Sequence, residues 1–112
     1  MEVKMRRIPY RVSRWKNGAM QTEVCYTVEY FVVDNKRTRI LATVDSRPWE
    51  ITSFRLRRNC INPDARRSLY ERALSGPYAV EYKELFRQLA ITEKDRLEVY
   101  TSGRGRQIVS NY

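Results

Sequence analysis

The dipeptide Asn17-Gly18, flanked on both sides by alternating apolar and polar residues, constrains this chain more than any other feature. Alternation with a period of two is typical of β-strands, and Asn-Gly favours a tight turn between two antiparallel strands. We therefore expect strands over residues 8–15 and 20–33, joined as a hairpin. A chain that starts in this way must build its fold around an antiparallel strand pair.

The length of this turn determines which residues of the hairpin lie opposite each other. A two-residue turn places Arg14 opposite Gln21 and Arg11 opposite Val24, and opposite residues share a face of the sheet. The alternation favours the even-numbered residues of the second strand as its core face: Thr22, Val24, Tyr26, Val28, Tyr30 and Val32. Since Arg11 would then lie on the core face, a bulge or a longer turn is the alternative, and the sequence leaves the register open.

Further turn residues divide the rest of the chain, and the hydrophobic period becomes helical after residue 60. The segment Asn62-Pro63-Asp64 predicts a helix start, because asparagine caps helices, proline fits the first turn and aspartate meets the positive end of the helix dipole. Ser75-Gly76-Pro77 ends this helix. The other expected elements are strands over residues 38–45, 49–58, 96–101 and 106–111 and a second helix over residues 78–90.

The expected order of elements is β-β-β-β-α-α-β-β. Strands followed by helices predict an α+β fold, with an antiparallel sheet and two helices packed on one of its faces. The length of 112 residues suits one domain, and no repeat or linker divides the chain. We therefore expect a single domain over residues 1–112, with a basic arm over residues 1–7.

Positive charge is the second strong feature of the sequence. Lys and Arg together number 22 against 13 Asp and Glu, which gives a net charge of +9 and a pI of about 9.9. Seventeen of the basic residues are arginines, whose planar guanidinium groups pair with phosphate and stack on flat rings. Residues 1–58 carry a net charge of +7. This distribution favours a polyanion as the binding partner.

Arginine residues alternate with aromatic residues in the expected strands, and two more arginines flank a glycine near the end of the chain. Guanidinium groups neutralise phosphates, and exposed rings stack on bases. The pattern predicts a small, non-catalytic protein that binds nucleic acid, either RNA or DNA. The residues expected to make the contacts are Arg11, Arg14, Trp15, Arg37, Arg39, Trp49, Arg55, Arg57, Arg58, Arg104 and Arg106.

The residue types needed for most catalytic sites are missing from the sequence. The chain contains no histidine, which is the most common general base and metal ligand. Without it, Cys25 and Cys60 have no histidine to activate them, and their spacing matches no metal site. We therefore expect no enzyme, no catalytic residues, no metal ligands and no cofactor.

Two other functions remain open. Arg, Tyr and Trp are enriched at interface hot spots, so the same residues would suit an accessory or inhibitor protein that binds an acidic surface of another protein. A ribonuclease that works without histidine is the second alternative. A compositional bias of the source genome would also explain the arginines, without any function. The sequence does not distinguish RNA from DNA and does not define the oligomeric state.

The sequence also bears on where the protein is found. Its first residues lack the apolar stretch of a secretion signal, and the longest apolar run, residues 30–33, is too short to span a membrane. We therefore expect a cytoplasmic protein without a membrane partner.

Overall fold

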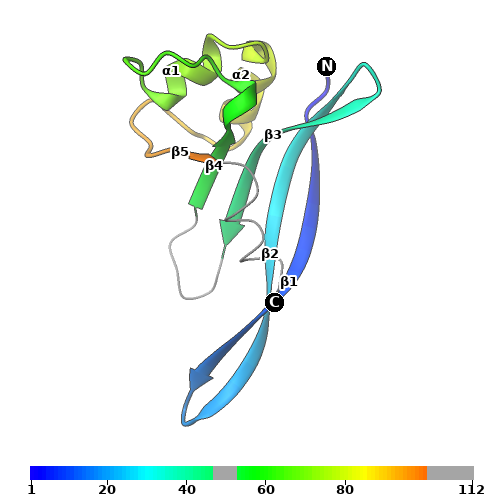
Figure 1. Ribbon diagram of the computed structural model, residues 1–112, viewed down its shortest axis with the longest axis vertical. Coiled ribbons are helices and arrows are strands. Elements are labelled where there is room, and N and C mark those ends of the chain that lie inside the picture. The colour runs from blue at the N-terminus through cyan, green and yellow to red at the C-terminus, as the bar shows by residue number, and fades with distance from the viewer. Residues whose placement is uncertain (47–52, 101–112) are drawn as a thin grey trace.

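The computed structural model describes residues 1–46 and 53–100. Five strands form one sheet in the order β1-β2-β3-β4-β5, and the helical segments lie together at one end of it (Figure 1). The strands are β1 (Lys4–Lys16), β2 (Ala19–Asp34), β3 (Arg37–Ser46), β4 (Ser53–Arg57) and β5 (Glu98–Tyr100). A 3-10 helix, η1 (Arg58–Cys60), and the helices α1 (Leu69–Leu74) and α2 (Ala79–Gln88) separate β4 from β5. The fold is α+β.

The sheet is mixed, which corrects the expectation of a purely antiparallel sheet. Strands β1 to β4 are antiparallel neighbours, whereas β5 pairs with β4 in parallel, with Val99 opposite Leu56. A parallel neighbour needs a long crossover connection, and the helical segment between β4 and β5 provides one. The strand expected over residues 106–111 lies outside the described residues.

The β1–β2 hairpin has the two-residue turn that its sequence predicts. Asn17 and Gly18 have φ angles of 54° and 78°, the left-handed conformation that a type I′ turn requires at both central residues. The register places Arg14 opposite Gln21 and Arg11 opposite Val24. Residues 4–7, which we expected as an arm, are the first residues of β1.

Only part of the expected core face of β2 is buried. Val32 is fully buried, but the Val24 side chain is 52% exposed and Tyr26 is also exposed. The reason is length: α2 has 10 residues and is about 15 Å long, whereas the 16 residues of β2 extend for about 50 Å. The helices therefore cannot cover the whole strand, and the expected burial of Val24 and Tyr26 was wrong.

The buried residues form two separate clusters. The main core combines strand residues with residues of η1, α1 and α2, and its fully buried side chains are Val32, Leu41, Ala42, Leu56, Ala73, Tyr82 and Leu85. Between the α2 helix and β4, the Phe86 and Phe54 rings meet edge to face at 6.3 Å. The second cluster is Tyr10, Val12 and Cys25. Tyr10 lies opposite Cys25, on the other face of the hairpin from Val24.

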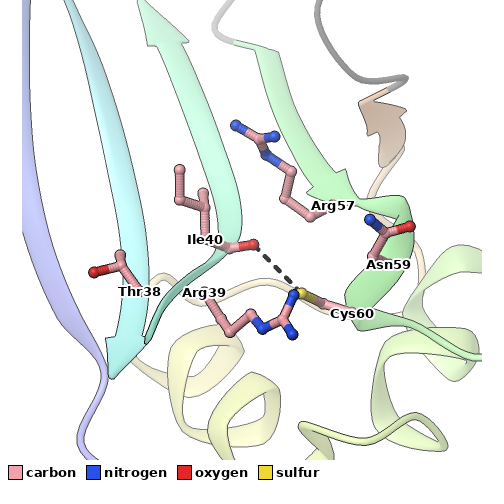
Figure 2. Close-up of a pocket in the computed structure, with 6 residues that line it drawn as sticks. All are labelled: Thr38, Arg39, Ile40, Arg57, Asn59 and Cys60. Carbon is pink, nitrogen blue, oxygen red and sulfur yellow. Dashed lines mark hydrogen bonds between the residues drawn. The ribbon is translucent and has the colours of Figure 1, made fainter. Parts of the chain in front are cut away.

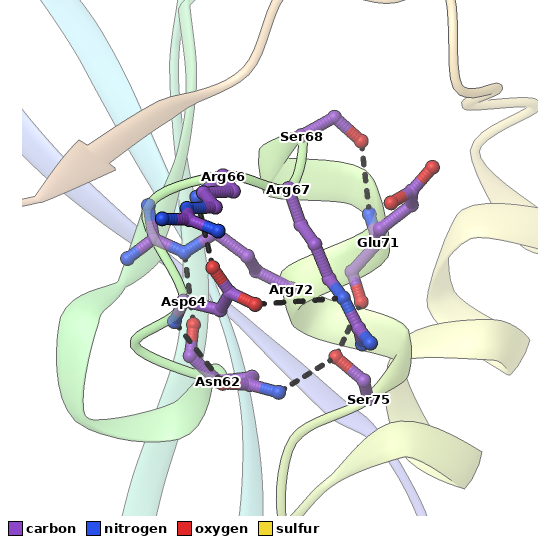
Figure 3. A network of polar contacts seen from close by, with 8 residues as sticks. All are labelled: Asn62, Asp64, Arg66, Arg67, Ser68, Glu71, Arg72 and Ser75. Atoms are coloured by element: carbon purple, nitrogen blue, oxygen red, sulfur yellow. Dashed lines mark hydrogen bonds and ion pairs between the residues drawn. The ribbon is translucent and has the colours of Figure 1, made fainter.

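The first helix starts later than expected, at Leu69 instead of near residue 62. The Asn62 and Asp64 side chains each accept a hydrogen bond from the backbone N–H two residues later, at 3.1 and 2.9 Å (Figure 3). Such turns offer the backbone an alternative to the helix, so the segment stays a loop. Ser68 is the actual cap, and its hydroxyl oxygen accepts from the Glu71 N–H at 3.2 Å.

The loop after α1 lies against this turn segment, and Gly76 is placed where a side chain does not fit. A Cβ atom at Gly76 would lie 2.9 Å from the Asn62 backbone nitrogen and 3.0 Å from the Ile61 Cα atom. We expect Gly76→Ala to lower the free energy of unfolding by about 1–3 kcal/mol, because the backbone of residues 61 and 62 must move. Urea denaturation followed by circular dichroism measures this change. A midpoint equal to that of the original protein would contradict the close packing.

Candidate ligand-binding surfaces

The predicted contact residues lie at several separate sites in the structure. Arg11 and Trp15 lie on one face of the β1–β2 hairpin, and Arg14 lies on the other. Arg39 and Arg57 line a pocket near the start of β3. Arg37 and Arg58 are exposed at the first residues of β3 and η1. The remaining predicted contacts are Arg55, which is ion-paired, and Trp49, Arg104 and Arg106, which lie outside the described residues.

One face of the hairpin carries exposed basic, aromatic and aliphatic side chains in a row, and we call it the hairpin face. The register places Arg11 opposite Val24 and Trp15 opposite Met20, so the side chains of each pair lie on the same side. The Trp15 side chain is 70% exposed. The hairpin face consists of Met5, Arg7, Arg11 and Trp15 of β1 and Met20, Val24 and Tyr26 of β2.

Arg7 and Tyr26 form a stacked pair in this face. The guanidinium carbon of Arg7 lies 4.1 Å from the centre of the Tyr26 ring. Stacking on a ring holds the guanidinium in place and leaves its N–H groups at the edge to donate hydrogen bonds. The pair therefore holds one positive charge on the hairpin face, and Arg11 adds a second, four residues further along β1.

Carboxylates accompany the arginines on the other face of the sheet. Arg14 lies 3.4 Å from Glu23, and Arg55 lies 3.1 Å from Glu98. The fully buried Glu29 lies 2.8 Å from Arg6. Because each of these carboxylates offsets a positive charge, this face is less suited to phosphate than the hairpin face.

The pocket near the start of β3 lies between that strand and η1 and has a volume of about 200 Å³. Arg39 and Ile40 extend from β3, and Arg57 and Cys60 come from the end of β4 and from η1 (Figure 2). The Cys60 thiol donates a hydrogen bond to the Ile40 carbonyl oxygen at 3.4 Å. The residues that line the pocket are Thr38, Arg39, Ile40, Arg57, Asn59 and Cys60.

The electrostatics of the pocket are centred on Cys60. Burial raises the pKa of the Cys60 thiol, while the positive charges of Arg39 and Arg57 lower it in part. The thiol therefore stays neutral at physiological pH. The pocket wall contains two cationic side chains and no carboxylate.

Sequence reasoning missed several residues of these surfaces. Arg7 and Tyr26 belong to the hairpin face, and the hairpin register contained the signal for them: if Arg11 lies opposite Val24, then Arg7 must lie opposite Val28 on the same side. No comparable signal existed for Asn59 and Cys60, because their approach to β3 depends on the turn made by η1.

Within residues 1–46 and 53–100, no group of three or more Cys, Asp and Glu side chains is placed to hold a metal ion. Nor does any helix in this part of the chain have the length and apolar character to cross a membrane. No protein family, curated protein or solved structure matches the chain.

Proposed function

We propose that this protein binds single-stranded nucleic acid on the hairpin face, without catalysis. The observation that carries the proposal is the exposed row of Arg7, Tyr26, Arg11 and Trp15 on one side of two paired strands. Positive side chains would follow the phosphate backbone, and an exposed ring would stack on an unpaired base. A single strand fits better than a duplex, because the bases of a duplex are already stacked on each other.

The dimensions of the hairpin face suit several nucleotides. Arg7, Arg11 and Trp15 are spaced four residues apart on β1, which corresponds to about 13 Å between neighbours. In the arrangement that we propose, the two helices cover one face of the sheet near β3 and β4. The hairpin strands extend beyond the helices and leave this face open to a ligand.

The test is a triple variant, Arg7→Gln, Arg11→Gln and Trp15→Ala. We expect at least a tenfold loss of affinity for single-stranded RNA or DNA, because one stacked base is worth about 1–3 kcal/mol and two phosphate contacts are removed. The slope of log K against log salt should decrease by about 1.4, since each lost contact to a single strand contributes about 0.7. Fluorescence anisotropy with labelled single-stranded RNA, single-stranded DNA and duplex DNA, each titrated with salt, measures both quantities.

The control is Arg66→Gln combined with Arg96→Gln, which removes the same charge from exposed positions outside the hairpin face. This double variant should lose affinity only slightly. If a folded triple variant binds as the control does, the hairpin face is not the binding site. Equal, weak binding of all three polymers only at low salt would mean that the net charge alone attracts them.

The aliphatic residues of the hairpin face favour a second candidate function. Met20 is exposed opposite Trp15, Val24 is exposed opposite Arg11, and Met5 is exposed near the start of β1. Exposed apolar patches often mark protein interfaces. Arginine and tryptophan are also the typical anchors of these interfaces. A nuclease-resistant 1:1 complex that the triple variant fails to form would support this candidate over nucleic acid.

A further inference from the structure

We propose that the outer edge of β1 binds an extended acidic segment of another protein as an added antiparallel strand. β1, drawn in blue in Figure 1, is the last strand on one side of the described sheet. An edge strand presents backbone N–H and C=O groups with which an extended peptide can pair. The opposite edge strand, β5, has only three residues, whereas β1 has thirteen. β1 is therefore the longer of the two templates.

The hairpin turn determines which residues of β1 have their backbone groups at this edge. The two-residue turn brings Lys16 and Ala19 together as a hydrogen-bonded pair. In an antiparallel ladder such pairs alternate with pairs that make no hydrogen bond to each other. The register continues without a shift from Lys16 to Lys4. The odd-numbered residues of β1, from Met5 to Trp15, therefore direct their N–H and C=O groups away from β2.

The position of Pro9 agrees with this assignment and limits the binding site. Pro9 is one of the odd-numbered residues, so the N–H that proline lacks would have pointed away from β2. Proline is tolerated at such a position of an edge strand. It divides the outer edge into two parts, and the longer part contains Arg11, Ser13 and Trp15. This part, which we call the free edge segment, offers three N–H and three C=O groups to an added strand.

The free edge segment is accessible. Arg11, Ser13 and Trp15 are all exposed, and their side chains lie on the hairpin face. The Ser13 hydroxyl lies 3.2 Å from the Thr22 hydroxyl of β2, with which it forms a hydrogen bond. The side chain in the middle of the segment is therefore directed towards β2 and not across the edge. An added strand would widen the hairpin face by one strand.

Charge complementarity indicates the chemistry of the added strand. The carboxylates that pair with basic residues of β1, Glu23 and Glu29, belong to β2, on the side of β1 away from the outer edge. Arg11 lies opposite the uncharged Val24. Opposite residues of neighbouring strands have Cβ atoms about 5 Å apart on one face, so a glutamate of the added strand can pair with Arg11. β1 itself has six basic residues and no acidic residue: Lys4, Arg6, Arg7, Arg11, Arg14 and Lys16.

The test uses a fluorescein-labelled heptapeptide in which threonine and glutamate alternate, with threonine at both ends. Anisotropy follows its binding to the full chain at about 0.15 M salt, where attraction between distant exposed charges is screened. In the proposed arrangement the three glutamates lie opposite Arg11, Ser13 and Trp15. We expect saturable 1:1 binding. The same peptide with lysine in place of glutamate should bind at least tenfold more weakly, because it places like charges side by side.

Methylation of peptide nitrogens distinguishes strand addition from attraction by charge. The glutamate N–H groups would point to β1, and the threonine N–H groups would point away from it. Methylation of the three glutamate nitrogens should weaken binding at least tenfold, because it removes the donors to the β1 carbonyls. Methylation of three threonine nitrogens leaves the peptide charge and these donors unchanged, and it should alter the affinity only slightly.

A variant of the protein tests the same edge. Ser13→Pro removes the middle N–H of the free edge segment and leaves the hydrogen bonds to β2 in place, as Pro9 does. Ser13→Ala is the matched control, because it removes the hydroxyl but keeps the N–H. We expect Ser13→Pro to weaken peptide binding at least tenfold and Ser13→Ala to bind as the original protein does. Circular dichroism verifies that both variants are folded.

Three results would overturn the proposal. The first is the absence of peptide binding. The second is an equal effect of the two methylated peptides, which would show that charge alone attracts the peptide. The third is self-association of the protein that Ser13→Pro abolishes, which would assign the edge to a second copy of the chain. The proposal does not rest on nucleic acid binding, since the peptide contains neither a base nor a phosphate.

Discussion

Replacing Tyr82 by alanine is expected to lower the free energy of unfolding by about 3–5 kcal/mol, the usual cost of removing a large aromatic side chain from a core. Tyr82 is fully buried, and its ring lies 5.8 Å from that of Phe86. Its hydroxyl donates a hydrogen bond to the Leu41 carbonyl oxygen. The β2–β3 register shifts at this point, so that Leu41 has no opposite residue in β2. The Tyr82 hydroxyl therefore satisfies a carbonyl at an irregular position of the sheet.

Urea denaturation of three variants separates the contributions of the ring and the hydroxyl. Tyr82→Phe keeps the ring and should cost about 1–3 kcal/mol, because it leaves the buried Leu41 carbonyl without this donor. Val80→Ala, on the exposed side of the same helix, is the control and should change stability by less than about 0.5 kcal/mol. A Tyr82→Ala variant as stable as the control would show that α2 does not pack on the sheet.

The second large effect is expected at Glu29, a fully buried carboxylate between two arginines. Glu29→Gln keeps the shape of the side chain but removes its charge. The Arg6 and Arg57 guanidiniums then lose this carboxylate as a counter-ion. We expect a loss of about 3 kcal/mol, at the lower end of the range for breaking a buried ion pair, because the Arg6 side chain is 47% exposed.

Glu23→Gln is the matched control for this variant, since Glu23 also pairs with two basic residues of β1 but is partly exposed. It should cost less than about 1 kcal/mol, and high salt should reduce that cost further. The cost of Glu29→Gln should persist in high salt, because buried pairs are screened less. Chemical denaturation at low and high salt measures the unfolding free energy of each variant. Equal losses for the two variants would show that Glu29 contributes no more than an ordinary surface charge.

The parts of the fold that depend on neighbouring residues could be predicted from the sequence. Asn17-Gly18 predicted the hairpin, because the turn needs positive φ at two consecutive residues. The sequence left the register open between a two-residue turn and a bulge or longer turn, and the structure shows the two-residue turn. The stop at Gly76 and Pro77 placed the end of α1 correctly, at Leu74. The predicted start of α1 was wrong because asparagine and aspartate, as at Asn62 and Asp64, are common both at helix caps and in isolated turns.

Features that depend on distant segments could not be predicted. The alternation in β2 shows which residues share a face, but it does not show which residues of that face are buried. Val24 and Val32 therefore read alike in the sequence, although one is half exposed and the other fully buried. The parallel direction of β5 depends on the path through α1 and α2, which no local pattern contains.

The same division applies to the candidate sites. Arginine in an alternating strand is visible in the sequence, whereas its counter-ion is not: Arg55 meets Glu98, 43 residues later in the chain. Arg11 has no such carboxylate opposite it and faces Val24. The charge count thus identified arginine as the candidate contact residue. The strand register is needed to tell which arginines lie near a carboxylate and which do not.

The position of β1 at the edge of the described sheet has a consequence for solubility. Thirteen residues of edge backbone are a template on which a second copy could add its own strand, the first step towards aggregation. Here Pro9 interrupts the row of backbone donors. The charged side chains along the strand, Lys4, Arg6, Arg7, Arg11, Arg14 and Lys16, all have the same sign. Like charges on two such edges would repel each other, which disfavours the pairing of two copies through β1.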